Sequence, residues 1–300
     1  MSSPSIRHGY LAAIGTVLIW SGFIVISRLG GTSILTPYDI LALRLTTASL
    51  ILLALFGPLP RPHWQDGRLW LLAALGGVGY GVLAYAGFKW APAAHGAILL
   101  PGLQPFLIAL LAWLLAGERP GPERVLGYGL IATGVMLTAI PLLSGTVHAG
   151  QWGGDALLLG ASLAWALFSV LTKRWAFSPW LLTRFVALAS AVLYLPVYLL
   201  LLPKAITVAP LSALLLQALY QGIGPTIIAM MLFLKAVEAL GPARVGALIA
   251  LVPVLVGLVS APLLHEPLTL WLGAGLLTVS CGAFLASRPF NRTRKTSCPT

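Results

Sequence analysis

Aromatic and amide side chains recur inside stretches that are otherwise apolar, and these are the residues best suited to bind a small molecule. Tryptophan offers a flat face for stacking and for cation–π contact, and tyrosine adds a hydroxyl group. An unpaired polar group costs several kcal/mol in an apolar environment, so these groups should face one another or a bound ligand. The candidate binding residues are Trp20, Tyr80, Tyr85, His95, Gln104, Trp165, Gln217 and Gln221.

Two alternatives stay open for these residues. Each tryptophan could instead face lipid or lie at the membrane interface, where aromatic belts form. His95 could titrate, because imidazole changes charge near neutral pH, or it could be a structural histidine with a fixed hydrogen-bond partner. Sequence spacing alone does not decide between these readings.

A glycine-rich segment, GGVGYGVLAYAG at residues 76–87, interrupts one of the apolar stretches. Glycine costs a helix about 1 kcal/mol relative to alanine, so the segment predicts a deformable helix beside a cavity. Close packing through small residues is the alternative. Tyr80 and Tyr85 would point about 140° apart on a regular helix, so only one reaches the cavity unless the helix bends. The candidate flexible positions are Gly77, Gly79, Gly81, Gly222, Gly224 and Pro225.

Four charged residues lie within or at the ends of apolar stretches. Arg44 and Arg184 lie within two turns of a predicted helix end, so they could extend to the membrane surface or could meet a carboxylate or a gate. Glu118 and Glu266 end their stretches just before helices that begin near a proline. A carboxylate is favourable at a helix N-terminus, and we interpret both glutamates as caps or gate elements.

Several kinds of chemistry lack the residues they need. The aspartates and glutamates all lie at or near the ends of apolar stretches, which argues against a buried proton relay. The sequence contains no Walker motif, no paired metal ligands and no arrangement of nucleophile and base. Cys281 and Cys298 are too few and too far apart for a disulfide framework. We therefore expect no cofactor, no metal site and no catalytic residue.

The composition places the chain in a membrane. Of its 300 residues, 59% are hydrophobic and 8% are charged, whereas soluble proteins carry about 25% charged residues. The mean hydropathy is +0.95. The net charge of +11 is spread between apolar stretches and does not gather on one segment, so we expect no nucleic-acid partner. The expected surroundings are a lipid bilayer, and the expected ligand is a small molecule.

Apolar stretches long enough to cross about 30 Å of hydrocarbon predict ten transmembrane helices and an all-α fold. Lysine and arginine are concentrated in the loops on one side, thirteen against three, which places both termini in the cytoplasm. The predicted spans are 9–29, 37–56, 69–90, 93–116, 124–142, 154–174, 180–202, 211–236, 243–264 and 268–287.

The two halves of the chain resemble each other. GTVLIWSGFIVISR at 15–28 aligns with GASLAWALFSVLTK at 160–173, which pairs Trp20 with Trp165 and Arg28 with Lys173. A slightly larger offset pairs Glu118 with Glu266. Each half holds five spans, so the second copy enters the membrane from the opposite side. We predict a first repeat at 1–148, an inverted repeat at 149–290 around a central cavity, and a basic cytoplasmic tail at 291–300.

LQPFLIALLAWLLAGERP at 103–120 and LVPVLVGLVSAPLLHEPL at 251–268 resemble the EamA-type repeats of the drug/metabolite transporter superfamily, in its ten-helix form. The resemblance covers nearly the whole chain. It implies a secondary transporter that works by alternating access in the inner membrane of a bacterium. Within the family, the aromatic-rich centre is most similar to exporters of aromatic amino acids.

The leading hypothesis from the sequence is therefore an exporter of aromatic or hydrophobic amino acids and related metabolites, acting as a monomer. A broad exporter of drugs or cationic toxicants would share the aromatic centre. A multispan enzyme acting on lipid would need clustered His, Asp or Glu at one interface, and no such cluster is present. A channel would need rings of carbonyls or charges in a filter. The inverted repeat favours a carrier.

Overall fold

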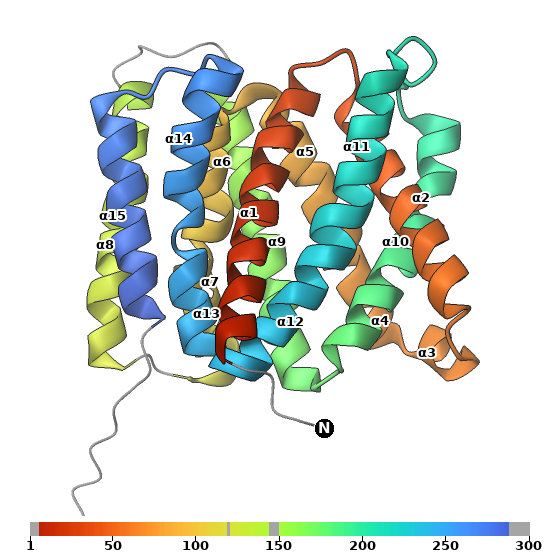
Figure 1. Cartoon of the computed structure of the whole chain (residues 1–300), viewed down its shortest axis with the longest axis horizontal. Helices are drawn as coiled ribbons and strands as arrows, with labels where there is room; N and C mark the ends of the chain where they lie inside the picture. Colours follow the sequence, from red (N-terminus) through yellow and green to blue (C-terminus); the bar gives the residue numbers. More distant parts are fainter. Residues whose placement is uncertain (1–5, 119–120, 144–149, 288–300) are drawn as a thin grey trace, which may run out of the picture.

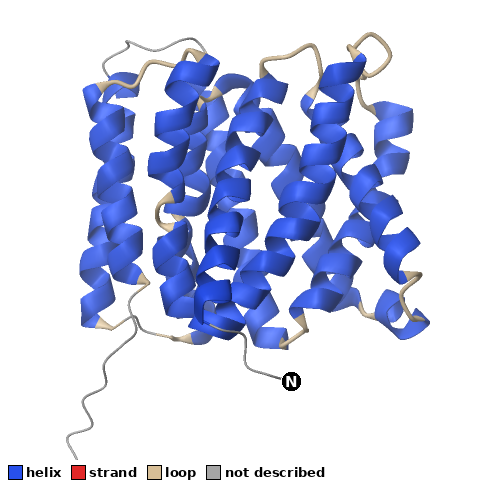
Figure 2. Cartoon of the chain, in the orientation of Figure 1, coloured by secondary structure: helices blue, strands red, loops and turns tan. Residues whose placement is uncertain are grey.

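The computed structural model describes residues 6–118, 121–143 and 150–287, and within these ranges all regular structure is helical (Figure 2). The predicted basic tail at 291–300 lies outside the described residues. The α-helices of the first half are α1 (Ile6–Gly31), α2 (Pro37–Phe56), α3 (Arg61–Gln65), α4 (Gly67–Leu72), α5 (Tyr80–Trp90), α6 (Ala93–Ala97), α7 (Gln104–Ala116) and α8 (Pro122–Leu143). Those of the second half are α9 (Gln151–Trp175), α10 (Pro179–Leu201), α11 (Leu211–Ile223), α12 (Ala229–Leu240), α13 (Pro242–Ile249), α14 (Val252–Leu264) and α15 (Leu270–Ala286).

The prediction of an all-helical membrane protein is confirmed. In the described part of the chain, nine continuous helical stretches are long and apolar enough to cross a bilayer, and Leu270–Ala286 is a shorter apolar helix. The third stretch, for example, runs over Gly67–Trp90, close to the predicted 69–90. The boundaries follow the apolar lengths because a helix rises about 1.5 Å per residue, so some 20 residues cross the hydrocarbon.

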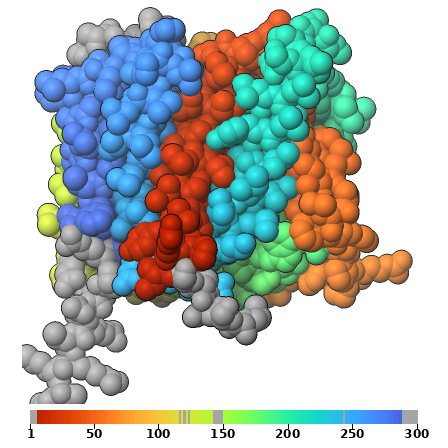
Figure 3. Space-filling view, viewed as in Figure 1, coloured from red at the N-terminus to blue at the C-terminus, as the bar shows by residue number. Residues whose placement is uncertain are grey.

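The helices stand roughly side by side, with α1 near the middle of the view and α8 and α15 at one edge (Figure 1). Helices from different halves of the chain pack together: α1 lies along α12, and α9 lies along α5. On the face drawn in Figure 3, α1 runs between α14 and the α11–α12 stretch. The centre of the bundle is therefore built by both halves.

Helix ends are fixed by local side-chain caps. Thr36 and Asp39 form a reciprocal capping box at the start of α2, in which each side chain accepts a backbone N–H of the other residue. Asp66 caps α4, and hydrogen bonds from Arg68 lower the pKa of the Asp66 carboxyl below its usual value. Left-handed backbone at Gly117 ends α7 in the same way that it ends many helices.

Three segments of the spans are π-helical: η1 (Ala73–Gly79), η2 (Ile98–Gly102) and η3 (Gly224–Ile228). Two of them coincide with the segments that the sequence predicted to be weak helices. π-Helical turns are rare and occur frequently at functional sites. Both tyrosines lie in α5, directly after η1, and the rings of Tyr80 and Tyr85 lie 6.5 and 6.3 Å from the ring of Phe23, so both face the same neighbour.

Close packing explains several of the predicted flexible glycines. A Cβ atom at Gly77 would lie 1.8 Å from Ser190 Oγ, and one at Gly222 would lie 2.6 Å from Thr47 Cβ. At Gly81 a Cβ atom would lie 2.6 Å from a methyl group of Leu41. Gly224 has ordinary contact distances, and Gly79 meets only a carbonyl oxygen of its own helix at 3.0 Å. Pro225 lies buried inside η3. Close packing therefore does not explain the glycines at 79 and 224, and backbone flexibility remains the interpretation at these two positions.

Helices α8 and α15 approach each other through glycine. A Cβ atom at Gly127 would lie 2.7 Å from the Gly282 carbonyl oxygen, and one at Gly282 would lie 2.6 Å from the Gly127 carbonyl oxygen. Gly134 and Gly275 face each other in the same way farther along the pair. Small residues permit this backbone-to-backbone contact between membrane helices.

Candidate functional site

A row of aromatic rings runs between the two halves of the chain. The Phe23 ring on α1 stacks on Tyr80 of α5, whose centroid lies 5.0 Å from that of Trp165 on α9. Trp165 in turn lies 5.1 Å from Phe168. Tyr80 and Trp165 are half-buried and retain accessible surface. Centroid separations of this size are typical of favourable aromatic pairs, and the row offers a flat apolar surface to a ligand.

The guanidinium of Arg44 lies at one end of this row. Its carbon lies 5.5 Å from the centroid of the Phe23 ring. Its Nε donates to Thr226 Oγ1 at 3.1 Å, and its Nη1 donates to Tyr85 Oη at 3.2 Å. All of these partners are neutral, and among the described side chains no carboxylate forms an ion pair with Arg44. Arg44 therefore lies within the bundle and does not extend to its surface.

Amide groups of α11 continue the polar network. Tyr85 Oη donates to Gln221 Oε1 at 3.3 Å, and Gln221 Nε2 donates to Ser27 Oγ at 3.1 Å. Gln217 accepts a further bond from Gln221 at 3.4 Å and donates to the Ile26 carbonyl oxygen. Gln217 and Gln221 are buried. These contacts connect the site to α1 and meet the expectation that buried amides pair with one another.

Three of the predicted binding residues lie elsewhere. Trp20 packs on Phe233 of α12, with ring centroids 5.5 Å apart. Gln104 donates two hydrogen bonds to Ser162 and connects α7 to α9. Trp20 lies on α1 together with Phe23 but packs on α12, and Gln104 reaches α9 at Ser162, so neither side chain forms part of the row.

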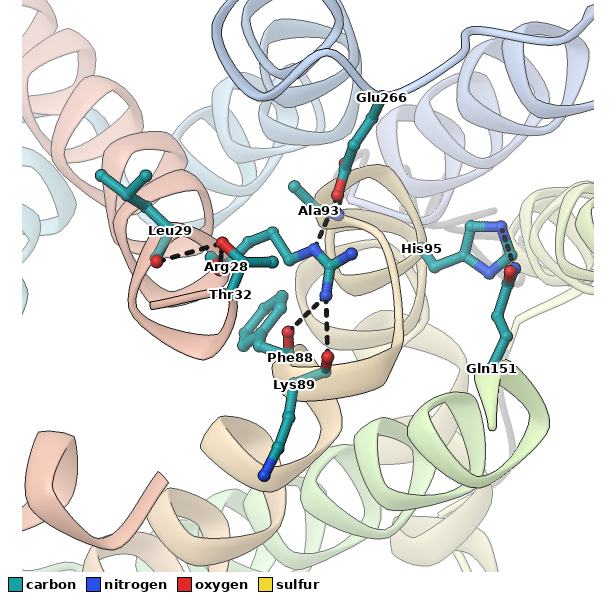
Figure 4. A network of polar contacts seen from close by, with 9 residues as sticks. All are labelled: Arg28, Leu29, Thr32, Phe88, Lys89, Ala93, His95, Gln151 and Glu266. Atoms are coloured by element: carbon teal, nitrogen blue, oxygen red, sulfur yellow. Dashed lines mark hydrogen bonds and ion pairs between the residues drawn. The ribbon is translucent and has the colours of Figure 1, made fainter. Parts of the chain in front are cut away.

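His95 also lies away from the aromatic row. Its Nδ1 lies 3.0 Å from an Asp155 carboxylate oxygen, and Gln151 approaches its other ring nitrogen at 3.5 Å. Figure 4 shows His95 and Gln151 on one side of the network that surrounds Arg28. A fixed carboxylate partner supports the structural interpretation of His95, because it holds the ring in one orientation.

The remaining charged candidates lie at helix ends. Arg184 donates from Nη2 to the carbonyl oxygens of Phe56 and Gly57 at the end of α2. Glu266 pairs with Arg28 at 2.7 Å, and Glu118 pairs with Lys173 at 2.6 Å. Arg184 therefore satisfies orphan carbonyls of a helix C-terminus, whereas each glutamate joins the two halves of the chain.

Sequence reasoning did not select Phe23, Phe168 or Thr226 as site residues. Phe23 and Phe168 occupy equivalent positions in the aligned halves, and this pairing was the available signal. Thr226 follows Pro225 in η3 and had no distinguishing pattern. Within the described ranges no three His, Cys, Asp or Glu residues gather to hold a metal ion.

These features are typical of a multispan membrane transporter: a helical bundle with membrane-length spans, and a row of aromatic and polar groups between the two halves that is suited to bind a ligand. The chain belongs to the EamA-like transporter family, whose model matches residues 7–140 and again residues 152–288. The family is one of transporters, in agreement with the expectation of a transporter and not an enzyme.

The curated relatives are distant. An aromatic amino acid exporter, YddG of Ancylobacter novellus, is 31% identical over 180 residues, which are 57% of this chain and 56% of that protein. An uncharacterised transporter, YyaM of Bacillus subtilis, is 29% identical over 108 residues, 35% of this chain and 34% of that protein. The chain thus spans about a third to just over half of the length of these relatives.

A solved structure shares the fold. One protein crystal structure superposes with a TM-score of 0.64 at 23% sequence identity, over 93% of this chain and 97% of that chain. The likeness extends over nearly all of both chains, so the arrangement of helices is common to both.

Proposed function

We propose that the protein exports aromatic and hydrophobic amino acids, and related metabolites, by alternating access in a bacterial inner membrane, as a monomer with both termini in the cytoplasm. The observation that carries the proposal is the row of rings formed by Phe23, Tyr80, Trp165 and Phe168 between the two halves of the chain. Inverted repeats of transporters place substrate at their interface, and a flat apolar wall there suits an aromatic side chain. The distant relative named as an aromatic amino acid exporter supports the same substrate class.

Counterflow in proteoliposomes tests this proposal. Vesicles loaded with unlabelled phenylalanine should accumulate labelled phenylalanine and tryptophan, and they should accumulate labelled threonine more weakly. Vesicles without protein provide the background. Absence of protein-dependent exchange for both aromatic amino acids would reject the proposal.

The Trp165→Ala variant tests the aromatic wall directly. The loss of one aromatic contact costs about 0.5–2 kcal/mol, or a several-fold to about thirty-fold weaker affinity. The effect should be confined to aromatic substrates. Trp20→Ala is the matched control, since Trp20 contacts Phe233 outside the row. Equal losses of affinity for phenylalanine and threonine in Trp165→Ala would mean that the row does not recognise the aromatic ring of the substrate.

A further inference from the structure

Arg44 is a cation held between helices of both halves without an acidic partner. Its guanidinium contacts Phe23 on α1, Tyr85 on α5 and Thr226 on η3. Two buried or partly buried carboxylates of the described chain are engaged elsewhere: Glu266 pairs with Arg28, and Asp39 accepts hydrogen bonds from Tyr198 and from Ala205 N. A charge inside a membrane protein is costly and marks a functional site by default.

The guanidinium also has unused donors. Arginine carries five N–H groups in a planar fork that matches a carboxylate, and the two hydrogen bonds of Arg44 use only Nε and one N–H of Nη1. The half-buried side chain retains accessible surface. A carboxylate at this position would gain charge-assisted hydrogen bonds in a setting of low dielectric, where such bonds are strong.

We propose that Arg44 is the residue that anchors the substrate carboxylate, and that the site therefore takes aromatic carboxylates, amino acids among them, and rejects aromatic cations. This inference rests on the proposed function and names its substrate class. With the carboxylate at Arg44, an aromatic side chain lies along Phe23, Tyr80 and Trp165, because these rings continue from the guanidinium in that order. A cationic drug would meet the guanidinium with like charge.

Competition against labelled phenylalanine measures this selectivity. Phenylacetate, which keeps the carboxylate, should compete in the wild-type protein, and phenethylamine, which keeps only the ammonium, should not. Arg44→Gln should weaken phenylalanine and phenylacetate by about ten- to a hundredfold and should narrow their advantage over phenethylamine. Arg44→Lys keeps the charge without the planar fork and should show a smaller loss.

Arg184→Gln is the matched control, because Arg184 contacts the Phe56 and Gly57 carbonyl oxygens and the Phe56 ring at the end of α2, away from the aromatic row. It should leave the ranking of competitors unchanged. If phenylalanine is not exchanged by the wild-type protein, the proposed function fails. The Arg44 assignment is then still tested by thermal unfolding, in which phenylacetate should stabilise the protein more than phenethylamine does. If phenylalanine is exchanged and Arg44→Gln and Arg44→Lys both keep the wild-type ranking and affinities, the Arg44 assignment alone is wrong.

A second, independent observation concerns two ion pairs at the two ends of the bundle. Arg28 lies in the last turn of α1 and Lys173 in the last turn of α9, at positions that the two halves of the sequence make equivalent. Glu266 and Glu118 are equivalent as well, and each directly follows a left-handed residue that ends its helix. Each pair takes its base from one half of the chain and its acid from the other.

The two pairs differ in burial. Arg28 and Glu266 are 15% and 12% exposed, whereas Lys173 and Glu118 are 71% and 53% exposed. Arg28 also donates to the carbonyl oxygens of Phe88 and Lys89, and Glu266 accepts from the backbone N–H of Ala93 (Figure 4). In Figure 1, α1 ends at the upper edge and α9 ends at the lower edge. Both pairs are formed, but the pair at the α1 end is buried and held by further hydrogen bonds, whereas the pair at the α9 end is exposed.

We infer that the Arg28–Glu266 and Lys173–Glu118 pairs are the two gates of alternating access, one tightened as the other loosens. The described conformation has the α1 end closed. Each pair joins one half of the chain to the other, and the two pairs are related by the repeat. Closing one end or the other therefore gives two equivalent states, as the rocking of inverted repeats requires. A buried ion pair is lost only when both charges gain water or new partners, so its opening is all-or-none.

Reversible cross-links test the two gates. Cysteine pairs at 28 and 266 and at 118 and 173, in a background without native cysteines, are joined by a short bifunctional thiol reagent that a reductant cleaves. Each cross-link should abolish the counterflow that the same cysteine variant shows before cross-linking, and the reductant should return counterflow to that variant's own rate. Cross-linking of Thr32→Cys with Ser212→Cys, an exposed position that follows α1 and an exposed position of α11, should not stop transport. Normal transport by either cross-linked gate would overturn the inference.

Single neutralisations separate the two ends. Glu266→Gln should increase the labelling of Ser27→Cys by an impermeant thiol reagent added at the α1 end, because Ser27 is fully buried and directly precedes Arg28 in the last turns of α1. Glu118→Gln should not increase it. Equal labelling in both variants would also overturn the inference. Counterflow measured on the same preparations before labelling shows that each variant is folded.

Discussion

Gly77 and Gly79 lie two residues apart in η1, yet their surroundings differ. Alanine should therefore lower stability at Gly77 and slow transport at Gly79. At Gly77 a Cβ atom would lie 1.8 Å from Ser190 Oγ and 2.8 Å from Ser190 Cβ. At Gly79 the only close atom is the Ala74 carbonyl oxygen at 3.0 Å. The space beside Gly77 is occupied by a side chain of a neighbouring helix, whereas the space beside Gly79 is limited only by the backbone of its own helical turn.

The expected magnitudes follow from these contacts. Overpacking costs about 1–3 kcal/mol, and displacement of Ser190 also weakens its hydrogen bond to the Ala73 carbonyl oxygen, worth about 0.5–1.5 kcal/mol. Alanine recovers about 1 kcal/mol of helix propensity. Gly77→Ala should therefore lower the free energy of unfolding by about 1–3 kcal/mol. Gly79→Ala should stay within about 1 kcal/mol of the wild type but should slow transport, because it stiffens the π-helical segment.

Two measurements on each variant separate stability from transport. Unfolding by SDS in mixed micelles, followed by circular dichroism, reports the change in free energy. Phenylalanine counterflow, normalised to folded protein, reports the rate. Wild-type stability of Gly77→Ala would contradict the packing described for α10 against η1. A normal transport rate in Gly79→Ala would mean that flexibility at this glycine plays no part in the cycle.

Three further outcomes are expected. Tyr198→Phe removes the 2.6 Å hydrogen bond to buried Asp39, so the free energy of unfolding should fall by about 1.5–3 kcal/mol in the same SDS titration, and a smaller change would show that Asp39 finds another donor. In intact cells without native cysteines, Thr32→Cys should react with an impermeant thiol reagent and Gly67→Cys should not, and the reverse pattern would invert the topology. Counterflow should need no imposed pH difference; a requirement that disappears in His95→Ala would make His95 a proton-coupling residue.

The spans were predictable because their length is set by bilayer thickness and their composition by the cost of polar groups in hydrocarbon. The weak helices around Gly79 and Gly224 were also visible, since glycine and proline act on the local backbone. That these segments are π-helical was not visible, because the extra residue per turn depends on the neighbouring helices.

Partners distant in the sequence were beyond local reasoning. Arg28 and Glu266 are separated by 238 positions, and the packing of α1 against α14, which ends just before Glu266, brings them together. Trp20 and Trp165 are equivalent in the aligned halves and pack on the corresponding spans, yet Trp20 meets Phe233 of α12 whereas Trp165 meets Tyr80 of α5. Equivalence in sequence therefore indicated which residues correspond to each other, and it did not indicate which residues share a site.

The glycine contacts between α8 and α15 bear on how the chain is assembled in the membrane. Helix α8 completes the first half of the chain, whereas α15 is made only after α9–α14. The backbone groove around Gly127 and Gly134 therefore stays without its native partner while all of the second half is synthesised and inserted. Because only a glycine-bearing helix fits this groove, early association with a wrong span is sterically hindered. The α8–α15 pair therefore closes only after the intervening helices α9–α14 have been made.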